Sequence, residues 1–589
     1  MASNSKLSIT LRNLAVKVAV VLVSAFVTFL IINFLCMGFT RGFVTTKTRL
    51  ATLSPGYLPV YLINNYKQTV TFLIKNVNNF AMYKKYYISY FICTLIPTIL
   101  YFVFLFKYKA QLTDWEPFKQ PQSEFGNAHW ATMAEMKKAK LFEKMGVMLG
   151  KYKDKYLVEY SFQHILLFAP TGSGKGVGFV IPNLLFWNES AIVHDIKLEN
   201  YEITSGYRFS VLHQKVFLWN PADQKGRTHC YNPMDWVARD VGGLVDDVQK
   251  IAKFLLPKDD FWNSEARSLV TGLMLSLYVE GSEKKPTLGE TLRMIRSEDL
   301  AYSLAVILDT LGGKIHPVGY MNLGAFLNKA DKERSGVCST ASSALELWSN
   351  PFVDAATSKS HTNIGSYRTI PTTLFVGISP NNIERLRPLL QIFYQQCATL
   401  FTNKLPTKQE KYGVLMLLDE FPTLGDMQEI KVGIAYYRGY KVKLFLIVQD
   451  TEQLKDIYKD AGMNSFMSNS YYRITFAANN TGTAKMISDL LGETSIESED
   501  AKKTKYINLS PGANDVTISK KKRALLMPQE VITLPRDEEI IVIESKPPVR
   551  CNKIKYYEDK TFIKRARMPV SYVPTQKPLI AETKKKDNK

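Results

Sequence analysis

The segment HILLFAPTGSGKGVGFVIPNLLFW, residues 164–187, constrains the fold of this chain more than any other stretch. An apolar run ends at Phe168, Gly172 and Gly174 follow in a turn, and Lys175 opens a second apolar run. This order predicts a strand, a glycine-rich turn and a helix whose amino end presents backbone N–H groups and a partial positive charge. Such a turn binds phosphate groups, and the lysine supplies a charge at the β- and γ-phosphates.

The turn departs from the usual G-x-x-x-x-G-K-[S/T] pattern at two positions. Ala169 stands in place of the first glycine, and Gly176 replaces the residue whose hydroxyl would help to hold Mg²⁺. Since neither change removes the N–H groups or the lysine, we expect ATP to bind here, with Mg²⁺ held mainly by carboxylates and water. The alternative is a glycine-rich turn without a ligand. The residues expected to contact the nucleotide are Ala169, Pro170, Thr171, Gly172, Ser173, Gly174, Lys175 and Gly176.

Short apolar runs separated by helical stretches follow this turn and predict an α/β fold with buried, largely parallel strands. Between residues 236 and 360 the strand pattern stops and helical periodicity takes over, so we expect an all-α domain inserted into the sheet domain. Segment 501–525 is interpreted as a surface excursion before the last strand. The predicted strands are 164–169, 191–197, 215–220, 372–379, 413–421, 443–450, 472–478 and 539–545.

Polar residues at the ends of later strands are candidates for the chemistry. The strand in LMLLDEF ends in Asp419 and Glu420, which has the form of a magnesium-binding carboxylate followed by a general base. Gln449 ends the next strand, where its amide could sense the γ-phosphate or orient water, and Arg438 in AYYRGYK is a candidate arginine finger. The alternatives are a solvated acidic pair, an ordinary strand-end amide and a surface arginine.

The charge is distributed unevenly. The net charge is +21, yet residues 1–110 hold 12 basic and no acidic side chains, and residues 546–589 hold 13 basic and 4 acidic ones. The body, 111–545, is therefore formally neutral, which does not favour a uniformly basic nucleic-acid clamp. The six cysteines form no C-x-x-C pair, which indicates ordinary thiols and no metal framework.

Two runs without charged residues, 18–40 and 86–106, are long enough to cross a bilayer. A cleaved signal peptide is the alternative for the first run. Two spans put both termini on one side, and the ATP-binding part requires that side to be the cytosol. The basic loop at 41–85 opposes this orientation under the positive-inside rule, but the need for nucleotide outweighs it.

Beyond these features, several longer motifs resemble the TraG/TraD/Vir-type coupling proteins of type IV secretion systems, over residues 125–567. The segments that carry the resemblance are APTGSGKGVGFVIPNLL, HDIKLENYEITSGYR, YNPMDW, FWNSEARSL, KERSGVCSTASSALELW, LLDEFPTLGDM, AYYRGYKVKLFLIVQD, FAANN and LLMPQEVITLPRDEEIIVIESKPP. This chain has Leu198 where the family often has glycine.

The resemblance implies an inner-membrane, homo-hexameric, RecA-like P-loop ATPase that binds ATP and Mg²⁺ and delivers substrates to the secretion channel. Its catalytic residues would be Lys175, Glu420, Arg438 and Gln449, with Asp419 at the metal. The expected organisation is a transmembrane anchor at 1–110, a RecA-like domain at 111–235 and 361–567, a substrate-facing all-α domain at 236–360 and a basic disordered tail at 568–589.

Two other functions stay open, and so does the substrate. A membrane-anchored double-stranded DNA translocase shares the motor fold, although no winged-helix DNA reader is visible in the sequence. A docking scaffold that no longer hydrolyses nucleotide is the second alternative. The substrate could be effector proteins or relaxase-bound DNA, and the neutral body favours proteins because a DNA pump needs a basic surface along the DNA backbone.

Overall fold

A computed structural model of the chain describes residues 126–280, 284–501 and 516–578, with a few isolated positions among the first 125. The chain divides into two compact units, one of residues 1–124 and 496–521 and the other of residues 125–495 and 522–589. The expected membrane spans, 18–40 and 86–106, lie outside the described residues apart from isolated positions. Among the residues that are described, no helix combines the length and the apolar character needed to cross a bilayer.

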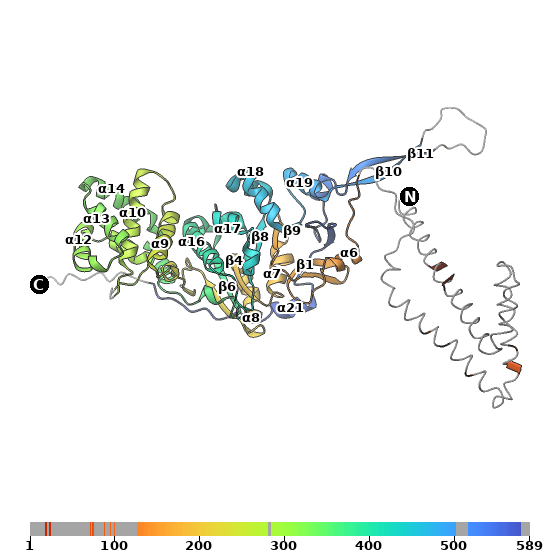
Figure 1. Ribbon diagram of the computed structural model, residues 1–589, viewed down its shortest axis with the longest axis horizontal. Helices are drawn as coiled ribbons and strands as arrows, with labels where there is room; N and C mark the ends of the chain where they lie inside the picture. The colour runs from red at the N-terminus through yellow and green to blue at the C-terminus, as the bar shows by residue number, and fades with distance from the viewer. Residues whose placement is uncertain are drawn as a thin grey trace, which may run out of the picture. The chain divides into compact units, whose positions relative to one another are not determined.

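Within the described chain, eleven strands form one mixed sheet in the order β2-β1-β13-β12-β9-β3-β8-β7-β4-β6-β5 (Figure 1). The strands from β9 to β5 run parallel. They are β3 (His164–Phe168), β4 (Ser190–Ile196), β5 (Lys215–Trp219), β6 (Thr372–Ile378), β7 (Val414–Leu418), β8 (Val442–Val448) and β9 (Ser470–Thr475). The antiparallel strands are β1 (Val147–Tyr152), β2 (Lys155–Glu159), β12 (Glu538–Ile543) and β13 (Val549–Asn552).

All eight predicted strands are present, but the sheet differs from the largely parallel one that the sequence predicts. The last predicted strand, β12, pairs antiparallel with β9 and β13. Because β12 and β13 are joined by only a short turn, they can pair only as antiparallel neighbours. Strands β1, β2 and β13 were not predicted, because their short runs contain charged residues.

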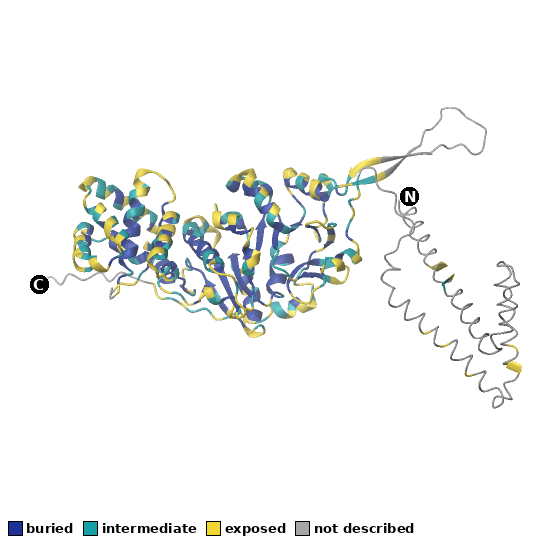
Figure 2. Ribbon diagram, viewed as in Figure 1, coloured by how far each residue is buried: buried dark blue, intermediate teal, exposed yellow. Residues whose placement is uncertain are grey.

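The parallel strands are buried on both faces, as their continuous apolar runs require. Ile165 and Leu167 contribute to one hydrophobic core, whereas Leu166 and Phe168 contribute to the other. The first core is closed by η3 (Gly176–Val180), α7 (Ile181–Leu184) and α8 (Glu199–Ser210). The second is closed by α16 (Ile383–Thr402), α17 (Gln428–Gly433), α18 (Thr451–Asn469) and α19 (Thr481–Leu491). Figure 2 shows this burial as dark strands between partly exposed helices.

Every described element between β5 and β6 is helical, and the second core continues into these helices. Side-chain caps begin most of them; Asp240, Asp260 and Asp299, for example, each accept a backbone N–H of the first turn. The α-helices are α9 (Val241–Leu255), α10 (Phe261–Ser276), α11 (Leu288–Ile295), α12 (Leu300–Leu311), α13 (Pro317–Leu327), α14 (Asp331–Ala344) and α15 (Pro351–Ala356). The shorter turns are η4 (Pro233–Trp236), η5 (Gly312–Lys314), η6 (Glu346–Ser349) and η7 (Ile364–Ser366).

The remaining elements lie outside the parallel part of the sheet. Strands β10 (Glu493–Ala501) and β11 (Val516–Ala524) form a two-stranded sheet, so the predicted surface excursion contains a strand. The remaining helices and turns are α6 (Met133–Lys138), η8 (Pro380–Asn382), η9 (Phe421–Leu424), η10 (Tyr437–Tyr440), α20 (Pro528–Ile532) and α21 (Lys560–Ala566).

The beginning of the segment predicted as a disordered tail makes defined contacts. The Tyr201 hydroxyl donates to the Ser571 carbonyl at 2.5 Å, and Gln576 N donates to the Gly226 carbonyl at 2.7 Å. Thr575 forms a β-bridge with Arg227. Residues 568–578 therefore lie extended along α8 and the loop after β5, where their backbone groups form hydrogen bonds. The composition of this segment does not reveal these contacts.

Candidate functional site

The loop from Ala169 to Gly176 connects the carboxyl end of β3 to η3. Gly172 and Gly174 have φ angles of +77° and +84°, the left-handed region that favours glycine. A side chain built at Gly172, Gly174 or Gly176 would meet no atom within 4 Å. One side of the loop therefore faces open space, as a turn that receives a phosphate chain requires.

Lys175 lies at the start of this helical segment and contacts the end of β7. Its Nζ is 3.0 Å from Asp419 Oδ1 in an ion pair, and it donates to Glu420 Oε2 at short range. Asp419 Oδ1 is buried and has no partner with hydrogen-bond geometry among the described residues. Burial raises the pKa of Asp419 above its usual value, and the opposing charge of Lys175 limits the rise.

Glu420 lies at the centre of the cluster. Its Oε1 accepts a hydrogen bond of 2.5 Å from Gln449 Nε2, while its Oε2 accepts from Lys175. The backbone of Glu420 is left-handed, with φ of 59°, and its carbonyl accepts from both the N–H and the hydroxyl of Thr423. Such strained non-glycine residues persist where the surroundings fix them, and they cluster at active sites. The parallel strands β3, β7 and β8 thus bring Lys175, Asp419, Glu420 and Gln449 together at one edge of the sheet.

His194 and Asp195 lie near the carboxyl end of β4, the strand next to β7. Burial, followed by the nearby Lys175 charge, lowers the pKa of His194 to about 3, so the ring is neutral at pH 7. Its Nδ1 is 3.1 Å from the Tyr394 hydroxyl. Burial also raises the pKa of Asp195 to about 7, although its carboxylate accepts the N–H groups of Asn200 and Tyr201 at 3.2 and 2.7 Å. Asp195 therefore caps α8.

The turn before α8 has a backbone conformation that favours glycine. Lys197 and Leu198 have φ angles of 84° and 67°, so two successive residues lie in the left-handed region. Glycine adopts this conformation without the steric cost that a Cβ brings. Leu198 also lies close to Gly377, where an added Cβ would approach Leu198 Cδ2 to 2.3 Å. Gly377 leaves room for the leucine.

Arg438 does not join the cluster within its own chain. It lies in η10, before the amino end of β8, whereas Gln449 follows the carboxyl end of that strand. The seven residues of β8 span roughly 20 Å at about 3.3 Å per residue, so the two edges of the sheet are far apart. The Arg438 side chain is exposed, and among the described residues no ion pair is seen for it.

Sequence reasoning missed one lysine at the loop. Lys553, just after β13, donates to the Ser173 carbonyl at 3.1 Å and to the Arg536 carbonyl at 2.8 Å. It is only 8% exposed, and burial lowers its pKa to about 8. Nothing in the sequence distinguished Lys553 from the many basic residues of this end of the chain.

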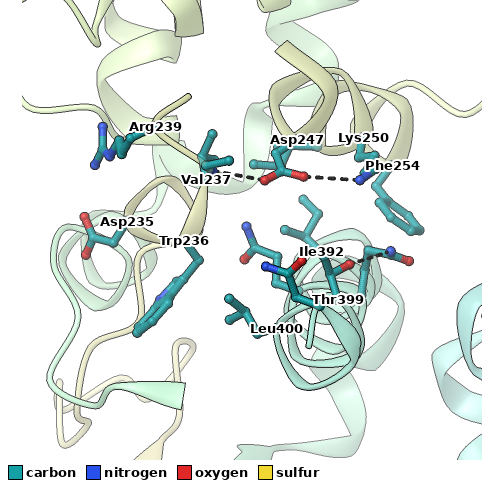
Figure 3. A pocket seen from close by; sticks show the side chains of 15 residues that line it. Asp235, Trp236, Val237, Arg239, Asp247, Lys250, Phe254, Ile392, Thr399 and Leu400 are labelled. Atoms are coloured by element: carbon teal, nitrogen blue, oxygen red, sulfur yellow. Dashed lines mark hydrogen bonds and ion pairs between the residues drawn. The ribbon is translucent and has the colours of Figure 1, made fainter. Parts of the chain in front are cut away.

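A separate cavity of about 320 Å³ lies between the segment 235–239, α9 and α16 (Figure 3). Asp247 accepts the Ala238 N–H at 3.0 Å and pairs with Lys250 at 3.2 Å on its rim. The described residues that line it include none from the loop 169–176, β7 or β8. The cavity is therefore distinct from the cluster around Lys175.

The sequence of this chain is similar to those of known proteins. A family model described as "Type IV secretory system Conjugative DNA transfer" matches residues 119–579. Protein VirD4 of Rhizobium radiobacter is 30% identical over 479 residues, which cover 78% of this chain and 68% of the relative. The conjugal transfer protein TraG of Escherichia coli is 29% identical over 502 residues, covering 76% of this chain and 79% of TraG. This chain thus spans about two thirds of the length of the VirD4 relatives.

Solved structures show a similar fold. The plasmid coupling protein TrwB in complex with ADP and Mg²⁺ aligns with a TM-score of 0.52 at 16% identity, over 78% of this chain and 98% of TrwB. TrwB with the ATP analogue ADPNP gives a TM-score of 0.54 at the same identity and coverage. At this identity the likeness concerns the fold, an α/β architecture around a large sheet.

Proposed function

The chain belongs to the type IV secretion coupling proteins, and from this membership we propose that it is an ATP-driven motor that recruits secretion substrates and delivers them to a type IV secretion channel. The observation that carries the proposal is the contact of Lys175 with Asp419 and Glu420 beside an open glycine loop. A structural ion pair alone does not need the open loop.

The residues fit a nucleotide with Mg²⁺. The N–H groups of 169–176 would hold the phosphates, and Asp419 would hold the metal, directly or through water. Its buried Oδ1, which contacts the Lys175 ammonium at 3.0 Å, is a hard oxygen ligand of the type that Mg²⁺ prefers. When bound, Mg²⁺ neutralises charge on the phosphates. Among the described residues, no group of three or more His, Cys, Asp or Glu side chains is placed so that it could hold a metal ion by itself.

Each side chain of the site would then have its own role in ATP hydrolysis. Lys175 leaves Glu420 and pairs with the phosphates, which frees Glu420 Oε2 to accept the proton of the attacking water. Gln449, which already donates to Glu420 Oε1, keeps the carboxylate oriented. The left-handed backbone of Glu420 fixes the position of the base before the nucleotide arrives.

Arg438 would complete the site of a neighbouring subunit. Its exposed guanidinium lies at the sheet edge opposite to its own loop, which supports action in trans. An arginine supplied in this way stabilises the charge that develops at the γ-phosphate. This assignment requires an oligomer, and we propose a homo-hexamer, as the family resemblance implies.

The remaining organisation is part of the same proposal. A transmembrane anchor at 1–110 would hold the protein in the inner membrane with both termini in the cytosol, next to the channel components. The RecA-like motor would comprise 111–235 and 361–567, and the helices of 236–360 would receive substrates. The near-neutral body favours effector proteins over relaxase-bound DNA as cargo, whereas the family description names DNA transfer.

ATPase assays on the detergent-solubilised protein and secretion assays in cells test the proposal. Wild-type protein should hydrolyse ATP, and loss of the Lys175 charge should stop both hydrolysis and secretion. Absence of hydrolysis by intact oligomers would instead favour a docking scaffold. Crosslinking from residues 236–360 in cells should capture the cargo. If the crosslinking captured double-stranded DNA and no protein, the result would favour a DNA translocase.

A further inference from the structure

The glycine loop has two different sides. A side chain at Gly172 or Gly174 would meet nothing within 4 Å, so that side is open. The other side is held by Lys553, whose Nζ donates to the Ser173 carbonyl at 3.1 Å. Its aliphatic carbons lie along the helix that follows, 3.5 to 3.9 Å from where a Cβ on Gly178 would stand. Lys553 therefore lies on the protein side of the loop, opposite the open space.

Lys553 is itself firmly placed. Its backbone N–H donates to the Asp537 carbonyl at 2.8 Å, and its ammonium donates to the Arg536 carbonyl at 2.8 Å. The same ammonium is 3.7 Å from the centre of the Phe476 ring, a cation–π contact. Its position is thus set by residues outside the loop, just before β12 and just after β9.

The Lys553 ammonium is buried despite the free-energy cost of burying a charge. Removing a charge from water is unfavourable, and burial lowers the pKa of Lys553 to about 8, partly offset by Glu539 and Asp537. Among the described residues, Lys553 has no carboxylate within ion-pair distance, whereas the nearby Lys555 pairs with Asp537 at 2.7 Å. The ammonium's hydrogen-bond partners are backbone carbonyls, one of them in the loop.

The planarity of the peptide links this contact to the nucleotide. In a trans peptide the carbonyl of one residue and the N–H of the next point in opposite directions. A donor on the Ser173 carbonyl therefore directs the Gly174 N–H away from Lys553, toward the open side. Gly174, being a glycine, could otherwise let this peptide rotate at little cost.

We propose that Lys553 is a positioning residue of the nucleotide loop: it holds the Ser173 carbonyl so that the Gly174 N–H faces the phosphates of the bound nucleotide. This inference rests on the proposed function, because it assumes that the loop binds nucleotide. The positive charge of the ammonium also lies behind the loop, where it favours binding of the negatively charged phosphates. Lys553 thereby ties the loop to the C-terminal segment, whose Tyr556 N–H and Arg565 side chain also contact the loop's helix, at Val177 and Leu185.

Binding of ADP with Mg²⁺ to the full-length, detergent-solubilised protein tests this role. Lys553→Met keeps the length and apolar packing of the side chain but removes the charge and the donors. Its dissociation constant for ADP should rise about tenfold, as expected for loss of one charge-assisted hydrogen bond. The KM for ATP should rise similarly with little change in kcat, because the interaction is made equally in the ground and transition states.

Two further variants separate positioning from a merely structural role. Lys553→Arg keeps a cation and donors, so it should recover most of the affinity. Lys555→Met removes a partly exposed lysine that pairs with Asp537 and Glu558, and it should bind ADP like wild type. Folded Lys553→Met protein with wild-type affinity and wild-type KM would overturn the inference.

A measurement on the wild-type protein serves if Lys553→Met does not fold. Hydrogen exchange with ADP and Mg²⁺ should become slower at 553–557 as well as at 169–176. Protection of the loop without any change at 553–557 would overturn the inference and leave the proposed function intact. Wild-type protein that binds no nucleotide would overturn both.

Discussion

Replacement of Glu420 by glutamine should separate two roles of this side chain, one in hydrolysis and one in the ion pair with Lys175. An amide cannot accept the proton of the attacking water, so turnover should fall by about 10²- to 10⁴-fold. The fold should be retained, because glutamine has the same shape and can still meet Gln449 and Thr423.

The same change should strengthen nucleotide binding. In the structure the Lys175 ammonium is held by Glu420 as well as Asp419, and both side chains of the Lys175–Glu420 pair are less than a quarter exposed. Nucleotide must displace the Glu420 contact before it can engage Lys175. Loss of the Glu420 charge weakens this competitor by about 1 kcal/mol, which corresponds to roughly fivefold tighter binding of ATP.

Turnover by phosphate release and ATP affinity by equilibrium binding measure the two effects on one preparation. Glu452→Gln is the matched control: Glu452 pairs with Lys455 at 3.1 Å, is half-exposed and lies outside the cluster. It should change neither quantity. Near wild-type turnover would assign the base to another group, and unchanged affinity would refute the competition between Glu420 and the phosphates.

Three further substitutions test the other parts of the site. Lys175→Ala should abolish ATP turnover and secretion but leave membrane insertion intact, as fractionation would show; normal secretion would contradict the motor. Gly176→Ser should retain activity and tighten Mg²⁺ binding, because the added side chain meets open space; an inactive protein in a magnesium titration would refute this account of the loop. Arg438→Ala should bind nucleotide but lose about 10³- to 10⁵-fold in turnover. Mixed oligomers of Arg438→Ala and Lys175→Ala should regain activity, and no recovery in oligomers known to be mixed would exclude action in trans.

The parallel core could be predicted from the sequence because its strands are buried on both faces. Such strands read as continuous apolar runs, and β3, β7 and β8 are the clearest cases. The direction of β12 could not be predicted, since an apolar run has the same composition whether its neighbour is parallel or antiparallel. Strands β1 and β2 were missed because Lys151 and Lys155, polar residues at their exposed ends, interrupt the pattern.

The candidate site likewise contains residues that could be predicted from the sequence and residues that could not. Lys175, Asp419 and Gln449 follow strand ends, so a parallel sheet brings them to one edge, and the structure places the first two in contact. Lys553 lies behind the loop because β13 pairs with β12. Its partner Ser173 is 380 residues away from it along the chain. No local pattern encodes such a contact. Asp195 is a similar case, because its capping of α8 depends on the unusual backbone of Lys197 and Leu198.

The placement of Arg438 at the sheet edge opposite to the loop has a consequence for stoichiometry. If each chain donates its arginine in one direction and receives one from the other, two chains related by a two-fold axis cannot both be completed through the same interface. Only head-to-tail contacts repeat the pairing, and only a closed rotational ring leaves no loop without an arginine. The number of competent sites would then equal the number of interfaces, and an open array of n chains would have one site fewer than it has subunits. Ring closure would thus add catalytic capacity without changing any single chain.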